Sequence, residues 1–496
     1  MVGLGARPRR GPAARRSAAI AFAACLALVG TLFNLPQRTA QAAPARPDVV
    51  LFYLDDNAPY PKYLWNDPGR TPNLARFANA GMEFRNAIAT TPQCGPARAA
   101  LLTGQYGHNN GVTRNNLKPY DQRGTLSPKL RAMGYKTVFV GKFHNNLRTQ
   151  YPGRARMKSL ANDWSQLDVI WEDQGQFYDW RQYRKGGSSY FGRKDTDHSS
   201  YQAARKAVQH IRQTKNGKRL FLTVSLYDGH DPLKPMRRFE GDHRCQGLKG
   251  WSGPAYDEAD VSDKPAWVRA HPRLGSPAYD LQDRCESLLT SDWVVGQVRQ
   301  ALKEAGRLGN TLQILTADNG YLMGDHRLEA KLNPYSTSVP LYMRWPKQLQ
   351  GRNKIVLEPV ANIDLAPTIC ALAGCTMPDA DGRSLLPLIT GQRKMLGRKF
   401  IFTEMLHSGI FWKHQPTGRP SWAGVESTRR YSATLWAYTR YRTGEEELYD
   451  VSRDPHHLTN LAGKPAYKKV LNDMRGFYRS VWNRDDVTWR YKLKPQ

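Results

Sequence analysis

Long apolar runs alternate along this chain with segments of helical spacing, and several of the runs end in charged or polar residues. The run 48–54 predicts a buried parallel strand that ends in Asp55-Asp56-Asn57. Similar patterns predict strands at 82–89, 135–140, 220–226, 312–316 and 339–343, and helices at 71–78, 201–213, 285–305 and from residue 363. This order predicts an α/β fold with a large mixed, mostly parallel sheet sandwiched by helices.

The pattern changes beyond residue 381. Strands at 400–404, 431–439 and 447–451 and a final helix at 467–482 predict a smaller C-terminal antiparallel α+β domain. We therefore expect a large α/β domain at 43–380 and a small domain at 381–496. The polar segments 151–199 and 232–277 are predicted to be insertions or long loops, the first of them near the mouth of the site.

The amino terminus has the three zones of a secretory signal. Five arginines lie between residues 7 and 16, an uncharged apolar run covers 18–33, and Ala40-Gln41-Ala42 forms an A-x-A cleavage site. We predict a signal peptide at 1–42 and a secreted, cell-surface or periplasmic protein. The pair Arg15-Arg16 leaves twin-arginine export open as the alternative to Sec. No later segment has the length and hydropathy of a membrane span.

Basic residues exceed acidic ones, with 73 Lys and Arg against 43 Asp and Glu, a formal net charge of +30. Outside the cell, such an excess favours a sulfated or carboxylated polysaccharide over a nucleic acid. No nucleic-acid motif accompanies it. A basic surface that serves only solubility is the alternative.

Six cysteines become five after signal cleavage, and an odd number in an exported protein marks one as chemically special. If that one is Cys94, the local pair Cys370–Cys375 leaves Cys245 to pair with Cys285. Four cysteines allow three connectivities, so the other two pairings stay open.

Cys94 stands just before a predicted helix that has Pro96 at its first position and Gly104 just past its end. The free N–H groups of a helix start favour negative charge there. Arg98 is four residues on and shares the same helix face. An anion cradle beside a reactive group is one interpretation, and a small buried thiol is the other.

Carboxylates and amides recur at the ends of predicted strands. Asp55 and Asp56 follow one strand, and Asp318 and Asn319 follow another. Because the carboxyl ends of parallel strands share one edge of a sheet, these oxygens are expected to meet and to suit Ca²⁺ or Mg²⁺. Turn or helix-capping acids are the alternative.

Titratable groups follow two further strands. Lys142 and His144 are two residues apart, so they point to the same side of an extended chain. His230 lies just past the strand at 220–226, and Lys331 follows Asp318 within 13 residues. A cation beside an imidazole suits an anionic substrate that needs proton transfer, whereas a surface lysine and a hydrogen-bonded histidine are the alternative.

The run Cys94-Gly95-Pro96-Ala97-Arg98, followed by Leu102-Thr103-Gly104, resembles the C-x-P-S-R-x-x-x-L-x-T-G signature of type I sulfatases in the alkaline phosphatase superfamily. Tyr449-Asp450, Asp454-Pro455 and Asn460-Leu461 resemble the closing pattern of that family. The sequence on both sides of the signature is most similar to that of the N-acetylglucosamine-6-sulfatase branch. Ala97 departs from the usual Ser.

The resemblance implies that a separate formylglycine-generating enzyme oxidises Cys94 to formylglycine. It implies that a Ca²⁺ ion, or Mg²⁺, is bound by Asp55, Asp56, Cys94, Asp318 and Asn319. It also implies that a hydroxyl of the hydrated aldehyde attacks sulfur, that His230 or Lys331 protonates the leaving oxygen, and that His144 takes the remaining hydroxyl proton. The residues expected to line the sulfate pocket and to carry the chemistry are Cys94, Arg98, Lys142, His144, His230 and Lys331.

The resulting hypothesis is an exported sulfatase that acts on a sulfated aminosugar or glycosaminoglycan-like saccharide. Asn115, Asp325 and His326 are nominated as substrate-binding residues at the mouth of the site. A phosphonate or phosphate ester hydrolase on the same scaffold is the nearest alternative. An inactive polyanion-binding protein is the alternative from another class.

Overall fold

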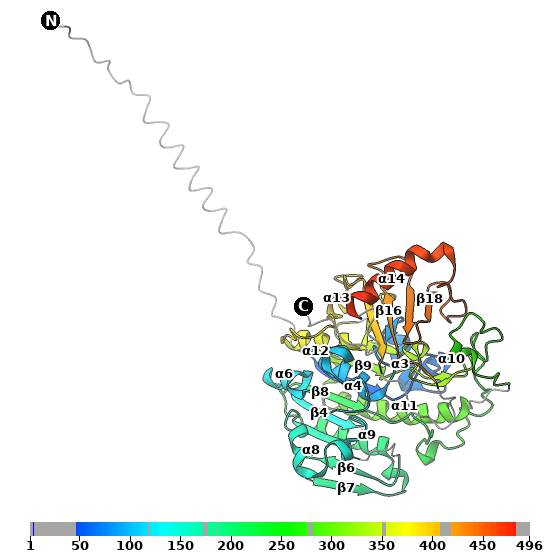
Figure 1. The fold of residues 1–496 in the computed structure, drawn as a ribbon. Helices are drawn as coiled ribbons and strands as arrows, with labels where there is room; N and C mark the ends of the chain where they lie inside the picture. Colours follow the sequence, from blue (N-terminus) through cyan, green and yellow to red (C-terminus); the bar gives the residue numbers. More distant parts are fainter. Residues whose placement is uncertain are drawn as a thin grey trace, which may run out of the picture. The chain divides into compact units, whose positions relative to one another are not determined.

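A ten-stranded sheet forms the centre of the protein (Figure 1). Its middle strand, β1 (Asp48–Leu54), is buried along its whole length and pairs in parallel with β9 (Thr311–Ala317) and β8 (Leu220–Ser225). The strands β4 (Lys136–Gly141) and β5 (Gln166–Ile170) continue the parallel part. Because these strands are covered on both faces, they are apolar along most of their length, which is the pattern that predicted β1, β4, β8 and β9.

Further strands complete a mixed sheet on both sides, in the order β13-β2-β12-β9-β1-β8-β4-β5-β6-β7. The pairs β9–β12, β12–β2, β5–β6 and β6–β7 are antiparallel, and β2–β13 is parallel. The outer strands are β12 (Leu341–Arg344), β2 (Met82–Phe84), β13 (Lys354–Val356), β6 (Trp180–Arg184) and β7 (Gly187–Phe191). The predicted fold class, a large mixed and mostly parallel sheet, is confirmed.

The structure, a computed structural model, describes residue 3 and residues 46–482 except 118–119, 172–176, 186, 276–280, 350–353 and 407–417. The predicted signal peptide at 1–42 therefore lies outside the described residues. From Arg46 onward the chain forms one compact unit. The domain division at residue 380 stays a prediction.

Helices lie on both faces of the sheet (Figure 1). One group packs around α11, and a second group packs around α4 and α12. The longer helices are α3 (Pro72–Ala80), α4 (Cys94–Thr103), α6 (Leu126–Ala132), α8 (Gly153–Ala161), α9 (Ser199–Arg212), α11 (Leu281–Glu304) and α12 (Leu365–Ala373). Short helices are α2 (Tyr63–Asn66), α5 (Gly107–Asn110), α7 (Leu147–Gln150), α10 (Ala266–Arg269) and α13 (Leu386–Ile389).

A separate four-stranded antiparallel sheet follows, covered by the helix α14 (Lys468–Val481). Its strands run in sequence order: β15 (Phe400–Met405), β16 (Trp422–Ser427), β17 (Trp436–Tyr441) and β18 (Glu446–Asp450). We call this the C-terminal sheet. It matches the predicted antiparallel α+β part of the chain.

Four element predictions need correction. The segment 82–89 is two short strands, β2 and β3 (Ala87–Ile88), because β3 leaves the main sheet and pairs with β14 (Val360–Ala361). The segment 151–199 is not a set of loops, since it holds α8 and β5–β7. The third strand of the C-terminal sheet begins at Trp436, and β16 was not predicted. The helix α4 begins at Cys94 itself.

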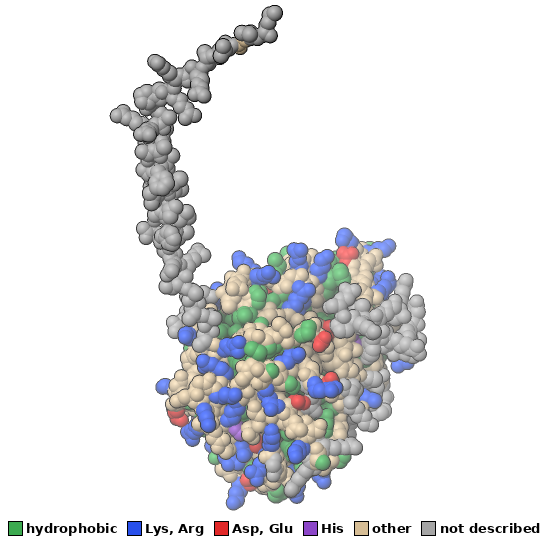
Figure 2. Space-filling view, turned by 90° about the vertical axis from the view of Figure 1, so that its left-hand side faces the viewer, with side chains coloured by type: hydrophobic (Ala, Val, Ile, Leu, Met, Phe, Trp, Pro, Cys, Tyr) green, Lys and Arg blue, Asp and Glu red, His purple; other side chains and the backbone are tan. Residues whose placement is uncertain are grey.

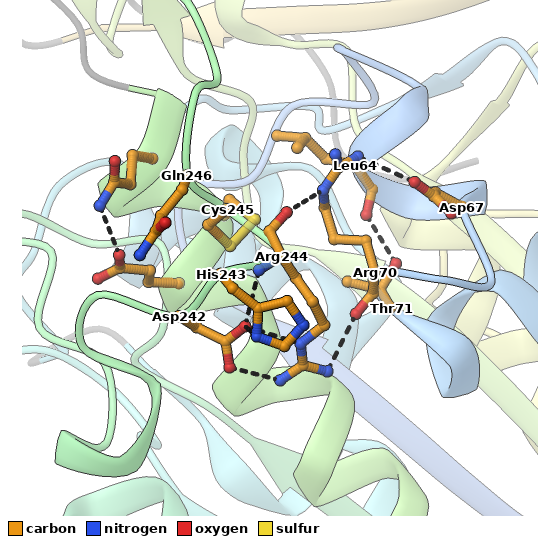
Figure 3. The surroundings of a disulfide bond; sticks show 12 residues. Leu64, Asp67, Arg70, Thr71, Asp242, His243, Arg244, Cys245 and Gln246 are labelled. Atoms are coloured by element: carbon orange, nitrogen blue, oxygen red, sulfur yellow. Dashed lines mark hydrogen bonds and ion pairs between the residues drawn. A yellow bond between two sulfur atoms is a disulfide. The ribbon is translucent and has the colours of Figure 1, made fainter.

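Both predicted disulfides are present, Cys245–Cys285 and Cys370–Cys375. The first ties the loop region 232–277 to α11. Figure 3 shows that the same loop also contacts the turn between α2 and α3, because Arg70 Nε donates to the carbonyl of Arg244 (2.9 Å). Arg244 in turn is held by Asp242 (2.8 and 2.9 Å).

Lysine and arginine side chains are spread over the face seen in Figure 2, with few acidic side chains between them. This agrees with the formal net charge of +30. Among the helices of the described residues, none combines the length and the apolar character that a bilayer crossing requires.

Candidate active site

The carboxyl ends of four neighbouring parallel strands bring the predicted site residues to one edge of the sheet. Asp55 and Asp56 follow β1, and Asp318 and Asn319 follow the adjacent β9. Lys142 and His144 follow β4, and His230 follows β8, on the other side of β1. In an open α/β sheet this edge is where ligand sites form.

Cys94 begins α4 and points its thiol into this edge. The Sγ atom donates to Asp55 Oδ1 (3.4 Å) and accepts from Lys331 Nζ (3.0 Å). The residue is 1% exposed. Burial, and next the Asp55 carboxylate, raise the pKa of the Cys94 thiol to about 12. Residue 94 thus lies between an acid and a cation at the start of a buried helix.

Three carboxylates cluster beside the thiol. Oxygen atoms of Asp55, Asp56 and Asp318 lie within 4.8 Å of one another. Asn319 Nδ2 donates to Asp56 Oδ1 (2.7 Å) and to the carbonyl of Gly320 (2.8 Å). Asn319 Oδ1 is buried and has no hydrogen-bond partner among the described residues. An amide oxygen left open beside three carboxylates is a donor set that fits a hard divalent cation.

Three cations balance these acids. Arg98 Nε donates to Asp318 Oδ2 (2.9 Å), Lys142 pairs with Asp55, and Lys331 Nζ donates to Asp56 Oδ2 (2.6 Å). Burial raises the pKa of Asp55, but Lys142 and Arg98 outweigh it and hold that pKa well below its usual range. Burial, and next the nearby Asp55, raise the pKa of Asp318 to about 7. The site therefore concentrates both signs of charge in a buried volume.

Two histidines complete the site. His144 is 3% exposed, and neither ring nitrogen makes a well-formed hydrogen bond among the described residues. The Gly95 N–H donates to Asn115 Oδ1 (2.9 Å), and the backbone of Gly95 also lies close to this ring. Burial, with the charges of Arg98 and Lys142, holds the pKa of His144 well below its usual range. A neutral imidazole whose nitrogens make no well-formed hydrogen bond within the described part of the chain is available to accept a proton.

His230 approaches from β8. Its Nε2 lies 3.8 Å from Asp56 Oδ2, and its Nδ1 donates to the carbonyl of Asp231 (2.6 Å). Burial, and next Lys331, lower the pKa of the His230 ring. The structure thus brings the other predicted catalytic residues together with the five residues predicted to bind the metal, which are Asp55, Asp56, Cys94, Asp318 and Asn319.

The three nominated substrate-binding residues separate into two places. Asn115 lies at the Cys94 turn, because its side chain accepts the Gly95 N–H. Asp325 accepts from Trp251 Nε1 (3.2 Å), and His326 Nδ1 pairs with Glu258 Oε2 (2.6 Å). These two line a separate cavity of about 490 Å³ that the C-terminal sheet helps to enclose. A substrate role for all three stays a prediction.

Family models match almost the whole described chain. The "Sulfatase" model matches residues 47–375, and the model "N-sulphoglucosamine sulphohydrolase, C-terminal" matches residues 324–481. The chain belongs to the sulfatase family. Its activity is that of a sulfuric ester hydrolase, as the signature around Cys94 led us to expect.

Three similar proteins frame this sulfatase. Human N-acetylglucosamine-6-sulfatase is 26% identical over 87% of this chain and 85% of its own length. The structure of BT4656 in complex with its substrate D-glucosamine-2-N,6-O-disulfate has a TM-score of 0.72, 19% identity, and covers 88% of this chain and 97% of its own. Phosphonate monoester hydrolase of Agrobacterium radiobacter has a TM-score of 0.65, 21% identity, and 88% and 95% coverage.

Several residues of the sulfatase site were missed from the sequence. The ring of Tyr227 lies 4.3 Å from Lys142 Nζ, and its position two residues after β8 was a usable signal. Arg284, next to the disulfide residue Cys285, donates to the Asp56 carbonyl (3.1 Å), where Asp56 has a φ of 50°.

The C-terminal part of the chain supplies two more such contacts. Arg419 Nη1, from the segment before β16, donates to the Lys331 carbonyl (2.6 Å), and Trp422 Nε1 donates to the Leu332 carbonyl (3.0 Å). Nothing in the linear sequence pointed to Arg419 or Trp422, because about 90 residues separate them from Lys331.

Proposed function

We propose that this sulfatase is exported and removes sulfate esters from a sulfated aminosugar or glycosaminoglycan-like saccharide. The observation that carries the proposal is the position of the Cys94 thiol between Asp55 and Lys331, next to three clustered carboxylates. The names of the similar proteins support the substrate class, since they include an N-acetylglucosamine-6-sulfatase and an enzyme bound to a disulfated glucosamine.

Cys94 is proposed to carry formylglycine, made by a formylglycine-generating enzyme before the chain is active. When present, the hydrated aldehyde supplies an oxygen nucleophile that a buried neutral thiol does not supply. Ala97 replaces the Ser of the usual signature. It is fully buried inside α4, with its carbonyl accepting from Asn362 Nδ2 (3.2 Å), so the folded site tolerates the smaller side chain.

Asp55, Asp56, Asp318 and Asn319, together with residue 94, are proposed to hold a Ca²⁺ ion, with Mg²⁺ as the alternative. The open amide oxygen of Asn319 supports this, because it gives the carboxylates a fourth oxygen donor. When bound, the cation supplies charge that stabilises oxygen anions at residue 94 and on the sulfuryl group.

The cations and histidines have separable roles. Arg98, Lys142 and Lys331 bind and orient the anionic sulfuryl oxygens, and they offset the charge that spreads onto them in the transition state. His230 Nε2 or Lys331 Nζ gives a proton to the leaving saccharide oxygen. A ring nitrogen of His144 accepts the proton of the second hydroxyl on residue 94, and this role is supported by the absence of a well-formed hydrogen bond to the ring among the residues described.

The deciding experiment measures sulfate release and the mass of residue 94 on one preparation. The peptide spanning Cys94 is expected to weigh about 18 Da less than the thiol form. The Cys94→Ala variant should lose activity while it keeps the melting temperature, and chelation of divalent metal should abolish activity reversibly. Sulfate release by Cys94→Ala at the wild-type rate would refute the proposal.

The similarity to a phosphonate monoester hydrolase supports one competing function. A comparison of kcat/KM for an aryl sulfate with that for an aryl phosphonate monoester separates the two. We expect the sulfate to be preferred. A preference for the phosphonate would reassign the chemistry and leave the metal and residue 94 in the same roles.

Export rests on the predicted signal at 1–42 and is supported by the two disulfides, which form in oxidising compartments. Amino-terminal sequencing of the mature protein should give a start at Ala43. A mature chain that retains residues 1–42 would contradict this.

A further inference from the structure

Three exposed cations stand at the same edge of the sheet as the active site. Lys234 and Arg237 lie a few residues after His230, and Lys194 lies three residues after β7, which runs in the same direction as β5. All three side chains are exposed, and none has an acidic partner within ion-pair distance among the described residues. We call Lys194, Lys234 and Arg237 the outer basic surface.

The backbone under these cations is fixed by hydrogen bonds. The carbonyl of Lys234 accepts from His198 Nε2 (3.0 Å), and the Arg237 N–H donates to the hydroxyl of Tyr178 (3.2 Å). The Lys194 N–H donates to Asp197 (3.0 Å). The surface is therefore presented in one arrangement while its charged ends remain in solvent.

A series of ring contacts connects this surface to the buried site. Lys142 Nζ lies 4.3 Å from the ring centre of Tyr227, and Tyr227 lies 5.4 Å from Phe177. Phe177 lies 5.6 Å from His198, whose ring is 5.0 Å from Tyr178. The Arg237 guanidinium then covers the Tyr178 ring at 5.5 Å. Few side chains thus separate the outer basic surface from the sulfate-binding cations.

Two of the acids in this region are already neutralised. Asp195 pairs with Arg238 (2.7 Å), and Asp179 pairs with Arg193. Glu240 is exposed on the same segment as Arg237, and Asp197, which accepts the Lys194 N–H, is half-buried, so two further acids lie nearby. Three cations against these two acids favour an anionic partner.

We propose that Lys194, Lys234 and Arg237 bind the sulfate or carboxylate groups of a polyanionic saccharide chain while its scissile sulfate ester lies at residue 94. This inference rests on the proposed function and narrows its substrate class from a sulfated monosaccharide to an oligosaccharide or polymer. Each exposed contact is individually weak, so the surface acts on binding and is screened by salt.

The test compares two triple variants of the full chain. The first is Lys194→Ala, Lys234→Ala, Arg237→Ala, which removes side chains and keeps the backbone hydrogen bonds described above. The matched control is Lys215→Ala, Lys218→Ala, Lys303→Ala. Those three lysines are also exposed, but they precede β8 and β9 and so lie at the opposite edge of the sheet.

Kinetics are measured with a sulfated oligosaccharide and with a small aryl sulfate between 50 and about 500 mM salt. For the first triple variant, we expect kcat/KM on the oligosaccharide to fall about 30-fold at low salt and to converge with wild type at high salt. Its activity on the aryl sulfate should stay within about twofold of wild type, and the control variant should behave as wild type. An equal loss in the control, or no loss in the first variant, would overturn the inference.

Binding of heparin to the same triple variants in a Cys94→Ala background separates this inference from the proposed function. A weaker, less salt-dependent affinity only in the first variant supports the surface, with the slope of log K against log salt reduced by about 2. If no sulfate ester is hydrolysed by wild type while this binding difference persists, the proposed function fails and the surface stands. Equal heparin binding by both variants overturns the surface alone.

Discussion

Two buried polar clusters of this protein differ in how their hydrogen bonds are satisfied. In the C-terminal part, Glu447 is 1% exposed and receives the hydroxyls of Tyr335 (2.5 Å), Tyr441 (2.5 Å) and Tyr449 (2.6 Å). At the active edge, by contrast, acids and cations are packed together while Asn319 Oδ1 and the ring of His144 lack partners among the described residues.

The difference teaches how a structural polar cluster can be told from a functional one. The buried Glu447 is surrounded by neutral donors that belong to the fold, and each of its oxygens has a partner. The active edge keeps open acceptors, at a cost in stability, where a ligand or a proton is to be received. Four substitutions test this contrast.

The largest effect is expected at His144. His144→Asn should lower kcat for sulfate release about 10³-fold, because the ring is the proposed proton acceptor. The melting temperature should stay within a few degrees of wild type, since the ring makes no well-formed hydrogen bond to lose. Steady-state kinetics and calorimetry check this, and wild-type turnover would remove His144 from the mechanism.

Glu447→Gln should show the opposite profile. Three hydroxyls lose their shared carboxylate, and we expect a loss of about 3 kcal/mol in the apparent free energy of unfolding. At a temperature where the variant is folded, kcat/KM should stay within about twofold of wild type. Urea unfolding and kinetics on one preparation measure both. A drop in kcat with unchanged stability would show that the two clusters do not differ as described.

Asn319→Ala tests the open amide oxygen. The affinity of the metal-free protein for Ca²⁺ is expected to fall about 10- to 100-fold by titration calorimetry. Asn319→Asp is the matched control, because it keeps an oxygen at the same place and should bind Ca²⁺ better than the alanine variant. Equal Ca²⁺ affinity in wild type and Asn319→Ala would exclude this residue as a ligand.

The smallest effect is the pH dependence due to His198, which is buried but, unlike His144, has both nitrogens bonded. Its Nδ1 accepts from the Ser200 N–H (3.1 Å) and its Nε2 donates to the Lys234 carbonyl (3.0 Å). Burial lowers the pKa of His198 to about 4, whereas the unfolded chain has a pKa of about 6.5.

The unfolded state therefore binds a proton first, so this group's contribution to stability is complete above pH 6.5 and is lost as pH falls toward 4. Between pH 6.5 and 5.5 the loss should be about 1 kcal/mol. The difference in unfolding free energy between wild type and His198→Asn, which can still accept the Ser200 N–H, should change by that amount. A constant difference would contradict the shift.

The positions of Asp55, Lys142, His230 and Asp318 could be predicted from the sequence. Each follows an apolar run, and buried parallel strands have to be apolar along their length. The sequences of the strands at the edges of the sheet contain no comparable apolar run. In β6, Arg181 and Arg184 face solvent. The polar composition of 151–199 therefore did not indicate the strands β5, β6 and β7.

The local sequence pattern did not predict that Lys331 lies in the site, and only the family resemblance assigned it there. Its neighbours Ala330 and Leu332 have φ values of 67° and 77°, a backbone path that no periodicity indicates. The same limit applies to Asp325 and His326. Because they follow Asp318 closely in the sequence, we expected them at the mouth of the active site. Trp251 and Glu258 instead hold them at the separate cavity of about 490 Å³.

The hydrogen bonds from Arg419 and Trp422 to the backbone of Lys331 and Leu332 have a consequence for building hybrid sulfatases. A chimera joined between residues 332 and 419 takes Lys331 from one parent and its two supports from the other. In such a hybrid, the left-handed backbone at residues 330 and 332 and the side chains that bind this segment come from different parents. The C-terminal sheet is thus not an interchangeable module, and a junction that preserves turnover has to keep residues 330–332 and 419–422 from the same parent.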